Sequence, residues 1–117
     1  MENKKLNRMI PIHFPNLEST YFEEISWQEG ENTGSHVIYG DVLTPYIVEC
    51  IENKNENEIK KIFDFIEEIL SFNDKYAEEV VTLSIFESIL YLFDNNRYIL
   101  DIIGQKSEEI LNELYKF

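Results

Sequence analysis

The chain has 117 residues, of which 23 are acidic and 10 are basic, so its formal net charge is −13 at pH 7. The length predicts a single domain over residues 1–117, and the 44% of apolar residues with only four glycines and three prolines excludes a disordered or turn-rich chain. The charge disfavours nucleic-acid binding, because contacts to phosphates need clustered lysine and arginine.

The acidic residues are unevenly placed along the chain. Between Arg8 and Lys54, 45 residues pass without one lysine or arginine, and eight of them are acidic. Such an anionic surface attracts cations and basic partners, and folding does not require it. We therefore expect a basic protein partner. A DNA mimic, whose carboxylates stand in for phosphates, is one form that such a protein can take.

The sequence shows neither a secretory signal nor a membrane span. Residues 1–10 carry three basic side chains, but no long apolar run follows them. We expect a cytoplasmic protein without a membrane partner. A single cysteine, Cys50, cannot form an internal disulfide, which agrees with a reducing compartment.

Helical periodicity begins after two prolines. Pro11 and Pro15 are expected to break the opening segment, and an amphipathic helix follows over residues 17–28. Residues 29–40 contain three of the four glycines and predict a loop. The sequence leaves open whether Val37–Tyr39 forms a short strand in this loop.

The middle of the chain predicts three helices, over residues 41–53, 58–72 and 74–93. Pro45 is tolerated in the first because it lies near the first turn, and an aspartate at the start of the first and third can cap each of them. In the second helix, apolar residues recur at the i, i+3, i+4, i+7 spacing of a buried stripe. We place it at the centre of the fold.

A polar break then leads to a short helix over residues 98–103, which Gly104 ends, and to a last helix over residues 107–115. Ser107 could cap the last helix, but Ile110 stands where a capping box has Glu or Gln, so the box is incomplete.

Together these elements predict an all-α fold, a single compact helical bundle of about five to six helices. Residues 41–72 and 74–115 can be read as two weak helix-pair repeats. The local packing is therefore expected to resemble that of a solenoid, although solenoid arrays normally need three or more repeats.

Few residues suggest chemistry. His13 and His36, both expected in loops, belong to no metal-binding motif, so we expect neither a metal nor a cofactor. Cys50 lies on the apolar face of a predicted helix beside Glu49, a setting that raises the pKa of a thiol and argues against a nucleophile.

Glu87 lies within the largely apolar segment 83–93, with Ser84 and Ser88 on the same side of the helix. This polar strip can simply reach solvent, or Glu87 can accept a buried hydrogen bond. A catalytic role would need a basic or nucleophilic companion that the sequence does not show, so we expect no catalytic residue.

Three segments, Tyr39–Tyr46, Ile62–Glu68 and Val80–Glu87, resemble a small bacterial helical family of uncharacterised domains. The resemblance covers about residues 39–114 and leaves the N-terminal third unmatched. Some members resemble immunity proteins of polymorphic or contact-dependent toxin systems. The resemblance implies that the protein binds a cognate toxin domain, often a nuclease with a basic groove, and blocks substrate entry.

We therefore predict a non-enzymatic, cytoplasmic immunity protein that neutralises a basic, nuclease-type bacterial toxin domain by blocking its active site. The contact is predicted on acidic residues with aromatic anchors, because hot spots favour Trp and Tyr within a polar rim. These residues are Tyr21, Glu23, Glu24, Trp27, Glu29 and Glu31. Solvated charge over a buried Trp27 is the alternative for this patch.

Two other functions compete with this hypothesis. An adaptor or scaffold domain would recruit a host protein, with acidity serving solubility only, and its apolar contact should barely respond to salt. A small enzyme would need the Glu87 region and a histidine brought together in one pocket.

Overall fold

The computed structural model describes residues 1–115, and every regular element among them is helical. The α-helices are α1 (Asn3–His13), α2 (Glu18–Ser26), α3 (Ser35–Ile38), α4 (Thr44–Glu52), α5 (Glu56–Ser71), α6 (Lys75–Val80), α7 (Glu87–Ile89) and α8 (Gln105–Tyr115). Wider π turns occupy Tyr39–Leu43 and Val81–Phe86, and 3₁₀ turns occupy Pro15–Leu17, Gly30–Asn32, Leu90–Leu92 and Arg97–Asp101. The predicted all-α bundle is confirmed.

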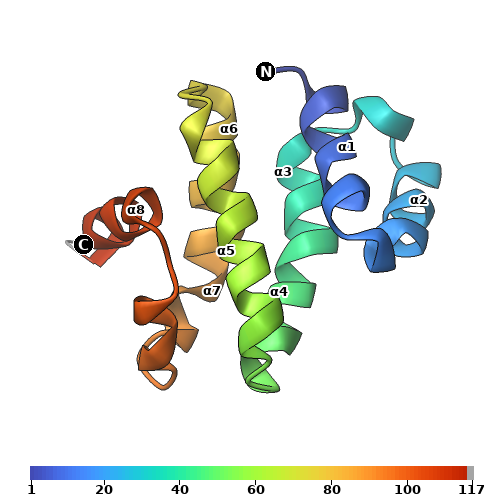
Figure 1. The fold of residues 1–117 in the computed structure, drawn as a ribbon. Coiled ribbons are helices and arrows are strands. Elements are labelled where there is room, and N and C mark those ends of the chain that lie inside the picture. The colour runs from blue at the N-terminus through green and yellow to red at the C-terminus, as the bar shows by residue number, and fades with distance from the viewer. Residues whose placement is uncertain (116–117) are drawn as a thin grey trace.

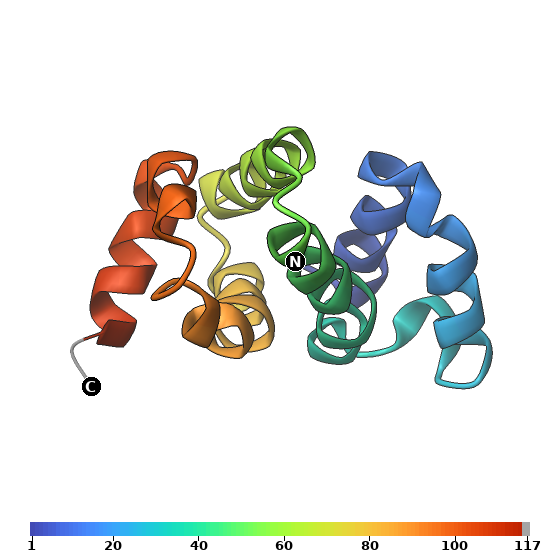
Figure 2. The ribbon, with the colours of Figure 1, turned by 90° about the horizontal axis from the view of Figure 1, so that it is seen from below.

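The helices form a row that the figures show from two sides. Figure 1 shows α4 and α5 side by side, with α1 and α2 toward one end and α8 at the other, and Figure 2 looks along the long helices. Consecutive helices lie next to each other, as in a solenoid. The molecule therefore has two distinct ends, one built from α1 and α2 and the other from α8.

The predicted central helix is confirmed as α5, which begins at Glu56 and ends at Ser71. Its apolar stripe is buried, and Phe63 stacks on Phe86 with ring centroids 6.2 Å apart. The Asn55 side chain accepts a hydrogen bond from the Glu58 amide and caps this helix.

The helix predicted over residues 74–93 is present as α6, a π turn and α7, continued by a 3₁₀ turn. Asp74 caps it as expected, since its carboxylate accepts from the Ala77 amide at 2.9 Å.

The loop predicted over residues 29–40 is wrong in its second half. Residues 35–52 form one uninterrupted helix through α3, the π turn and α4, so Val37–Tyr39 is helical rather than extended. Asp41 lies inside this helix and does not cap it. Three glycines suggested a loop, but only Gly40 lies inside this helix, and burial of Ile38 and Tyr39 against the core outweighs the low helix propensity of that one glycine.

Pro45 lies well inside that helix, not near its start. A proline ring clashes with the carbonyl of the residue four positions earlier and offers no N–H to it. The π turn over Tyr39–Leu43 widens the helix directly before Pro45 and accommodates both defects. Pro45 does lie in the first turn of α4, as predicted, but α4 continues a helix that begins nine residues earlier, at Ser35.

The expected break at Pro11 is also wrong, because α1 runs through it to His13. Leu6 and Ile10 are fully buried on one face of α1, and the following Phe14 meets Phe65 of α5 edge-on at 5.2 Å. Since Pro11 stands near the end of the helix, it removes only one late hydrogen bond, which this packing offsets.

The C-terminal elements follow the prediction with shifted bounds. The short helix is a 3₁₀ turn over Arg97–Asp101, and α8 starts at Gln105, two residues before the expected Ser107. Buried apolar side chains from all the long helices join in one cluster, to which Ile99 and Leu111 belong.

Candidate functional site

The acidic residues of the protein lie at its surface. All 23 acidic residues are described, and none of them is buried. Among the described residues, ion pairs with lysine or arginine involve only the carboxylates of Glu31 and Asp64. Most of the negative charge is therefore not neutralised by such a pair within the described chain.

The sequence-predicted patch lies at the end of the molecule formed by α1 and α2. Trp27 directly follows α2 and is 72% exposed, which overturns the alternative of a buried Trp27. Phe22, five residues earlier on α2, is 51% exposed. Glu23 and Glu29 are exposed nearby in the chain, so carboxylates and aromatic side chains do share this end.

Tyr21 does not belong to this exposed surface. Its side chain is 1% exposed, and its hydroxyl has no hydrogen-bond partner among the described residues. Burial raises the pKa of the Tyr21 hydroxyl. Tyr21 therefore supports α2 from within and is not an anchor that a partner could reach.

Glu31 is occupied by cations from the same chain. Its carboxylate accepts a hydrogen bond from Arg8 Nε at 2.7 Å and lies 3.7 Å from Lys4 Nζ. The hydrogen bond from Arg8 lowers the pKa of Glu31. In the fold, α1 packs beside the stretch that lacks cations, so Arg8 and Lys4 bring positive charge to Glu31 within it.

Glu24 and Asp41 bring two like charges together. Partial burial raises the pKa of the Asp41 carboxyl, and the charge of Glu24 on α2 raises it further. Glu24 also accepts from Gln28 Nε2 at 2.9 Å. A partner's cation placed between the two carboxylates would relieve their repulsion, so this pair extends the patch from α2 onto the π turn.

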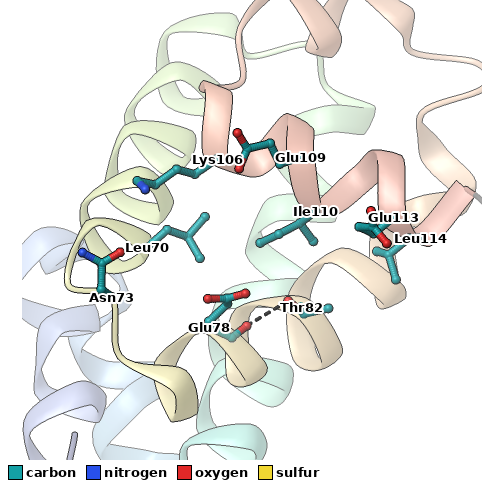
Figure 3. A pocket seen from close by; sticks show the side chains of 9 residues that line it. All are labelled: Leu70, Asn73, Glu78, Thr82, Lys106, Glu109, Ile110, Glu113 and Leu114. Atoms are coloured by element: carbon teal, nitrogen blue, oxygen red, sulfur yellow. Dashed lines mark hydrogen bonds between the residues drawn. The ribbon is translucent and has the colours of Figure 1, made fainter.

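A second candidate lies at the opposite end of the molecule and was missed by sequence reasoning. A groove of about 530 Å³ lies between α6, α8 and the C-terminal end of α5. Figure 3 shows the side chains that line it. Leu70, Ile110 and Leu114 provide its apolar lining, and Glu78 and Glu109 stand on its two sides. The alternation of Glu109 and Glu113 with Ile110 and Leu114 on α8 was the available sequence signal.

The groove exists because Glu67 of α5 holds α8 in place. Its carboxylate accepts hydrogen bonds from the Lys106 amide at 3.1 Å and from the Ser107 amide and hydroxyl at 2.8 and 2.7 Å. This tertiary cap replaces the incomplete local capping box. A Cβ atom on Gly104 would lie 2.3 Å from the Glu67 side chain, so any other residue at this position would force Glu67 to move away from α8.

The structure brings one histidine next to a serine and a glutamate. His36 Nδ1 lies 3.0 Å from Ser84 Oγ, and His36 Nε2 lies 3.4 Å from Glu79 Oε1. Ser84 is nevertheless buried, and the cleft lined by Glu79 includes neither His36 nor Ser84. Since the buried Ser84 hydroxyl lies outside that cleft, we interpret the contacts of His36 with Ser84 and Glu79 as a link between α3 and the helix that contains Ser84.

The other candidate residues have structural surroundings. Both histidines lie in helices rather than loops, and His13 Nε2 is 2.9 Å from Glu68 of α5. Cys50 is buried, and burial raises the pKa of its thiol as expected. Glu87 and Ser88 are exposed and reach solvent, whereas Ser84 of the same strip is buried.

The described residues form neither a metal site nor a membrane-spanning helix. Within residues 1–115, no group of three or more His, Cys, Asp or Glu side chains is arranged to hold a metal ion. None of the helices in the same range combines the length and apolar character that crossing a bilayer requires.

Comparison with known proteins gives one match. A family described as Domain of unknown function (DUF7674) matches residues 8–117, so the match includes most of the N-terminal third that the sequence resemblance left out. No curated protein and no solved structure matches the chain.

Proposed function

Since the chain belongs to the DUF7674 family, whose description names no activity, we propose from its own surface that it is a non-enzymatic immunity protein. It would act in the cytoplasm of a bacterium by binding a basic, nuclease-type toxin domain and blocking access to its active site. The observation that carries the proposal is the anionic exterior, with 23 acidic residues and none of them buried.

Charge of this kind suits rapid capture of a basic partner. Complementary potentials steer two proteins together and raise the association rate, and they also disfavour wrong partners. A toxin that acts on nucleic acid needs a basic groove for the phosphates, and carboxylates presented by an inhibitor can occupy that groove.

The end formed by α1 and α2 supplies a contact of the right composition. Trp27 is exposed beside Glu23 and Glu29 in the chain, which gives an aromatic anchor within an acidic rim. The repelling pair Glu24 and Asp41 adds a place where a partner's lysine or arginine would be stabilised. We therefore place the toxin contact on Glu23, Trp27 and Glu29, with Glu24 and Asp41 beside them.

The test uses the protein together with the product of the gene next to its own. Association is measured by surface plasmon resonance at low and high salt, for the wild type and for Glu23→Lys/Glu29→Lys. We expect association to slow at least about tenfold at high salt and in this variant. The matched control, Glu49→Lys/Glu52→Lys on exposed positions of α4, should change the rate much less.

A growth assay completes this test. Cells that express the neighbouring gene should stop growing and should recover when the protein is co-expressed. A neighbour that is neither basic nor toxic, or an association rate that ignores salt, would contradict the proposal.

The adaptor function remains the second candidate, and one observation favours it. Phe22 and Trp27 are both more than half exposed, which is an unusual amount of aromatic surface for one short helix. An adaptor would bind through these side chains, and its affinity would fall in Phe22→Ala/Trp27→Ala but not with added salt. The same salt series therefore separates the two functions.

A further inference from the structure

We propose that the groove between α5, α6 and α8 is a second contact site, which binds a short cationic amphipathic helix of a partner protein. The source of that helix, a basic partner, rests on the function proposed above. The lining and the charges of the groove define what can bind there.

Three of the nine residues that line the groove are aliphatic. Leu70 is almost fully buried, whereas Ile110 and Leu114 on α8 are only partly buried and face the groove (Figure 3). A groove volume of about 530 Å³ lies within the range of natural binding clefts, roughly 300 to 1,000 Å³. Aliphatic side chains of a partner would cover apolar surface that the chain itself leaves in contact with water.

The groove continues onto an adjoining depression over α6. The two share Asn73, Glu78 and Thr82, and the depression also includes Leu83, which is 47% exposed. The apolar surface therefore extends beyond a single side-chain pocket, and it suits an elongated occupant better than a compact one.

The charges define the occupant further. Glu78 lies on the α6 side of the groove, while Glu109 and Glu113 lie on the α8 side, against one lysine, Lys106, in the lining. An occupant with aliphatic side chains below and lysine or arginine on both flanks matches this arrangement. An amphipathic helix with apolar residues at i, i+3, i+4 and i+7 has that distribution.

The same charges argue against other occupants. Nucleic acids and anionic small molecules would be repelled by the glutamates on either side. A second copy of this chain would bring another strongly acidic surface, since the net charge is −13. A cationic helix is the class that both the apolar floor and the acidic flanks favour.

The experiment uses the purified full chain and a fluorescein-labelled 14-residue peptide of leucine and lysine, with leucine at the helical positions given above. Binding is followed by fluorescence anisotropy. The wild type should bind this peptide and should not bind a peptide in which each lysine is replaced by glutamate. Failure of the wild type to bind the lysine peptide would overturn the inference.

Three variants locate the binding. Glu78→Gln/Glu109→Gln should weaken binding about tenfold, because two flanking charges are lost. Glu49→Gln/Glu52→Gln removes the same charge from exposed positions of α4, outside both the groove and the contact at Glu23 and Glu29, and should change affinity less than about threefold. Thr82→Trp fills the groove without a change of charge and should also reduce affinity, and urea unfolding confirms that each variant is folded.

Equal weakening by both glutamine pairs would mean that overall charge alone attracts the peptide, and it would overturn the inference. An unchanged affinity in Glu78→Gln/Glu109→Gln would do the same. Because the peptide assay needs no natural partner, its result is independent of the capture experiment. The proposed function can therefore fail while the groove stands, and the reverse also holds.

Discussion

The two ends of the molecule are both acidic, but they are held together in different ways. At the N-terminal end, several polar contacts join α1 to the segment before α3 and to Ser35, the first residue of α3. Asn7 donates to the carbonyls of Glu31 and Thr33 and accepts from the Ser35 hydroxyl, and Asn3 accepts from the Ser35 amide. At the C-terminal end, one carboxylate, that of Glu67, makes the polar contacts that hold the start of α8.

Because of this difference, the surface near Trp27 should tolerate substitutions, whereas the groove beside α8 depends on a single residue. Trp27 directly follows α2, and α2 packs against α1, which is the helix that these polar contacts anchor. The groove rests on the position of α8, which depends on Glu67 and on the absence of a side chain at Gly104. Four substitutions test this contrast.

The largest effect is expected at Gly104. Gly104→Ala places a methyl group on the Glu67 carboxyl, and overlap together with lost hydrogen bonds should lower the free energy of unfolding by about 3 kcal/mol. Urea unfolding measures this. Gly40→Ala is the control, because its Cβ would lie an ordinary 4.0 Å from Ser84 Cβ, and it should be neutral or stabilising. Equal destabilisation by both would contradict the special role of Gly104.

Asn7→Ala is expected to have the next largest effect, about 2 kcal/mol, because it leaves buried carbonyls and a hydroxyl without their partner. Thermal unfolding checks this value against Asn32→Ala, whose side chain is exposed and should change stability little. If the N-terminal end is anchored at many points, Asn7→Ala should leave Trp27 fluorescence in the folded protein nearly unchanged.

Glu24→Gln should lower the pKa of Asp41, since the charge of Glu24 is one of the causes that raise it, after partial burial. A carboxyl whose pKa is raised by folding loses stability as the pH rises from its unfolded-state pKa through its folded pKa. Glu24→Gln should therefore add slightly to stability at neutral pH. Carbon NMR titration of Asp41 measures the shift, and Glu23→Gln, which leaves Glu24 intact, should not reproduce it.

Arg8→Gln should have the smallest effect on stability, because the Arg8–Glu31 pair is exposed. The pKa of Glu31 should rise toward its usual value when the hydrogen bond from Arg8 is removed. The lowered pKa contributes stability above the unfolded-state pKa, and this contribution is lost as the pH falls through the folded pKa. NMR titration of Glu31 shows the shift, and Lys5→Gln should leave it unchanged.

Sequence patterns identified the elements whose stability is local. The apolar spacing of α5 and the cap at Asp74 were both sufficient to predict their helices. In contrast, α1 was missed because Pro11 and the nearby Pro15 dominate the pattern, while its stabilising contacts, such as those of Leu6 and Asn7, are made with distant segments. The continuous helix through Pro45 was missed for a related reason, since a π turn has no clear pattern of residues.

The candidate surfaces were predicted in part. Exposure of Trp27, Glu23 and Glu29 agrees with the predicted patch. Tyr21 and Phe22 are adjacent on α2 and therefore point in different directions, Tyr21 inward and Phe22 outward. The groove could not be predicted, because the position of α8 is set by a contact between Glu67 and Ser107, 40 residues apart in the chain.

The attachment of α8 has a consequence for hydrogen exchange. Among the polar contacts given above, one carboxylate holds the start of α8, and Leu111 is its one side chain in the buried apolar cluster, so α8 can open while the rest of the fold stays closed. Its amides should therefore exchange with solvent earlier than those of α5. The groove disappears each time this happens. A peptide that binds there stabilises only the closed state, so it should slow exchange along α8 in proportion to its occupancy and leave α1 and α2 unaffected.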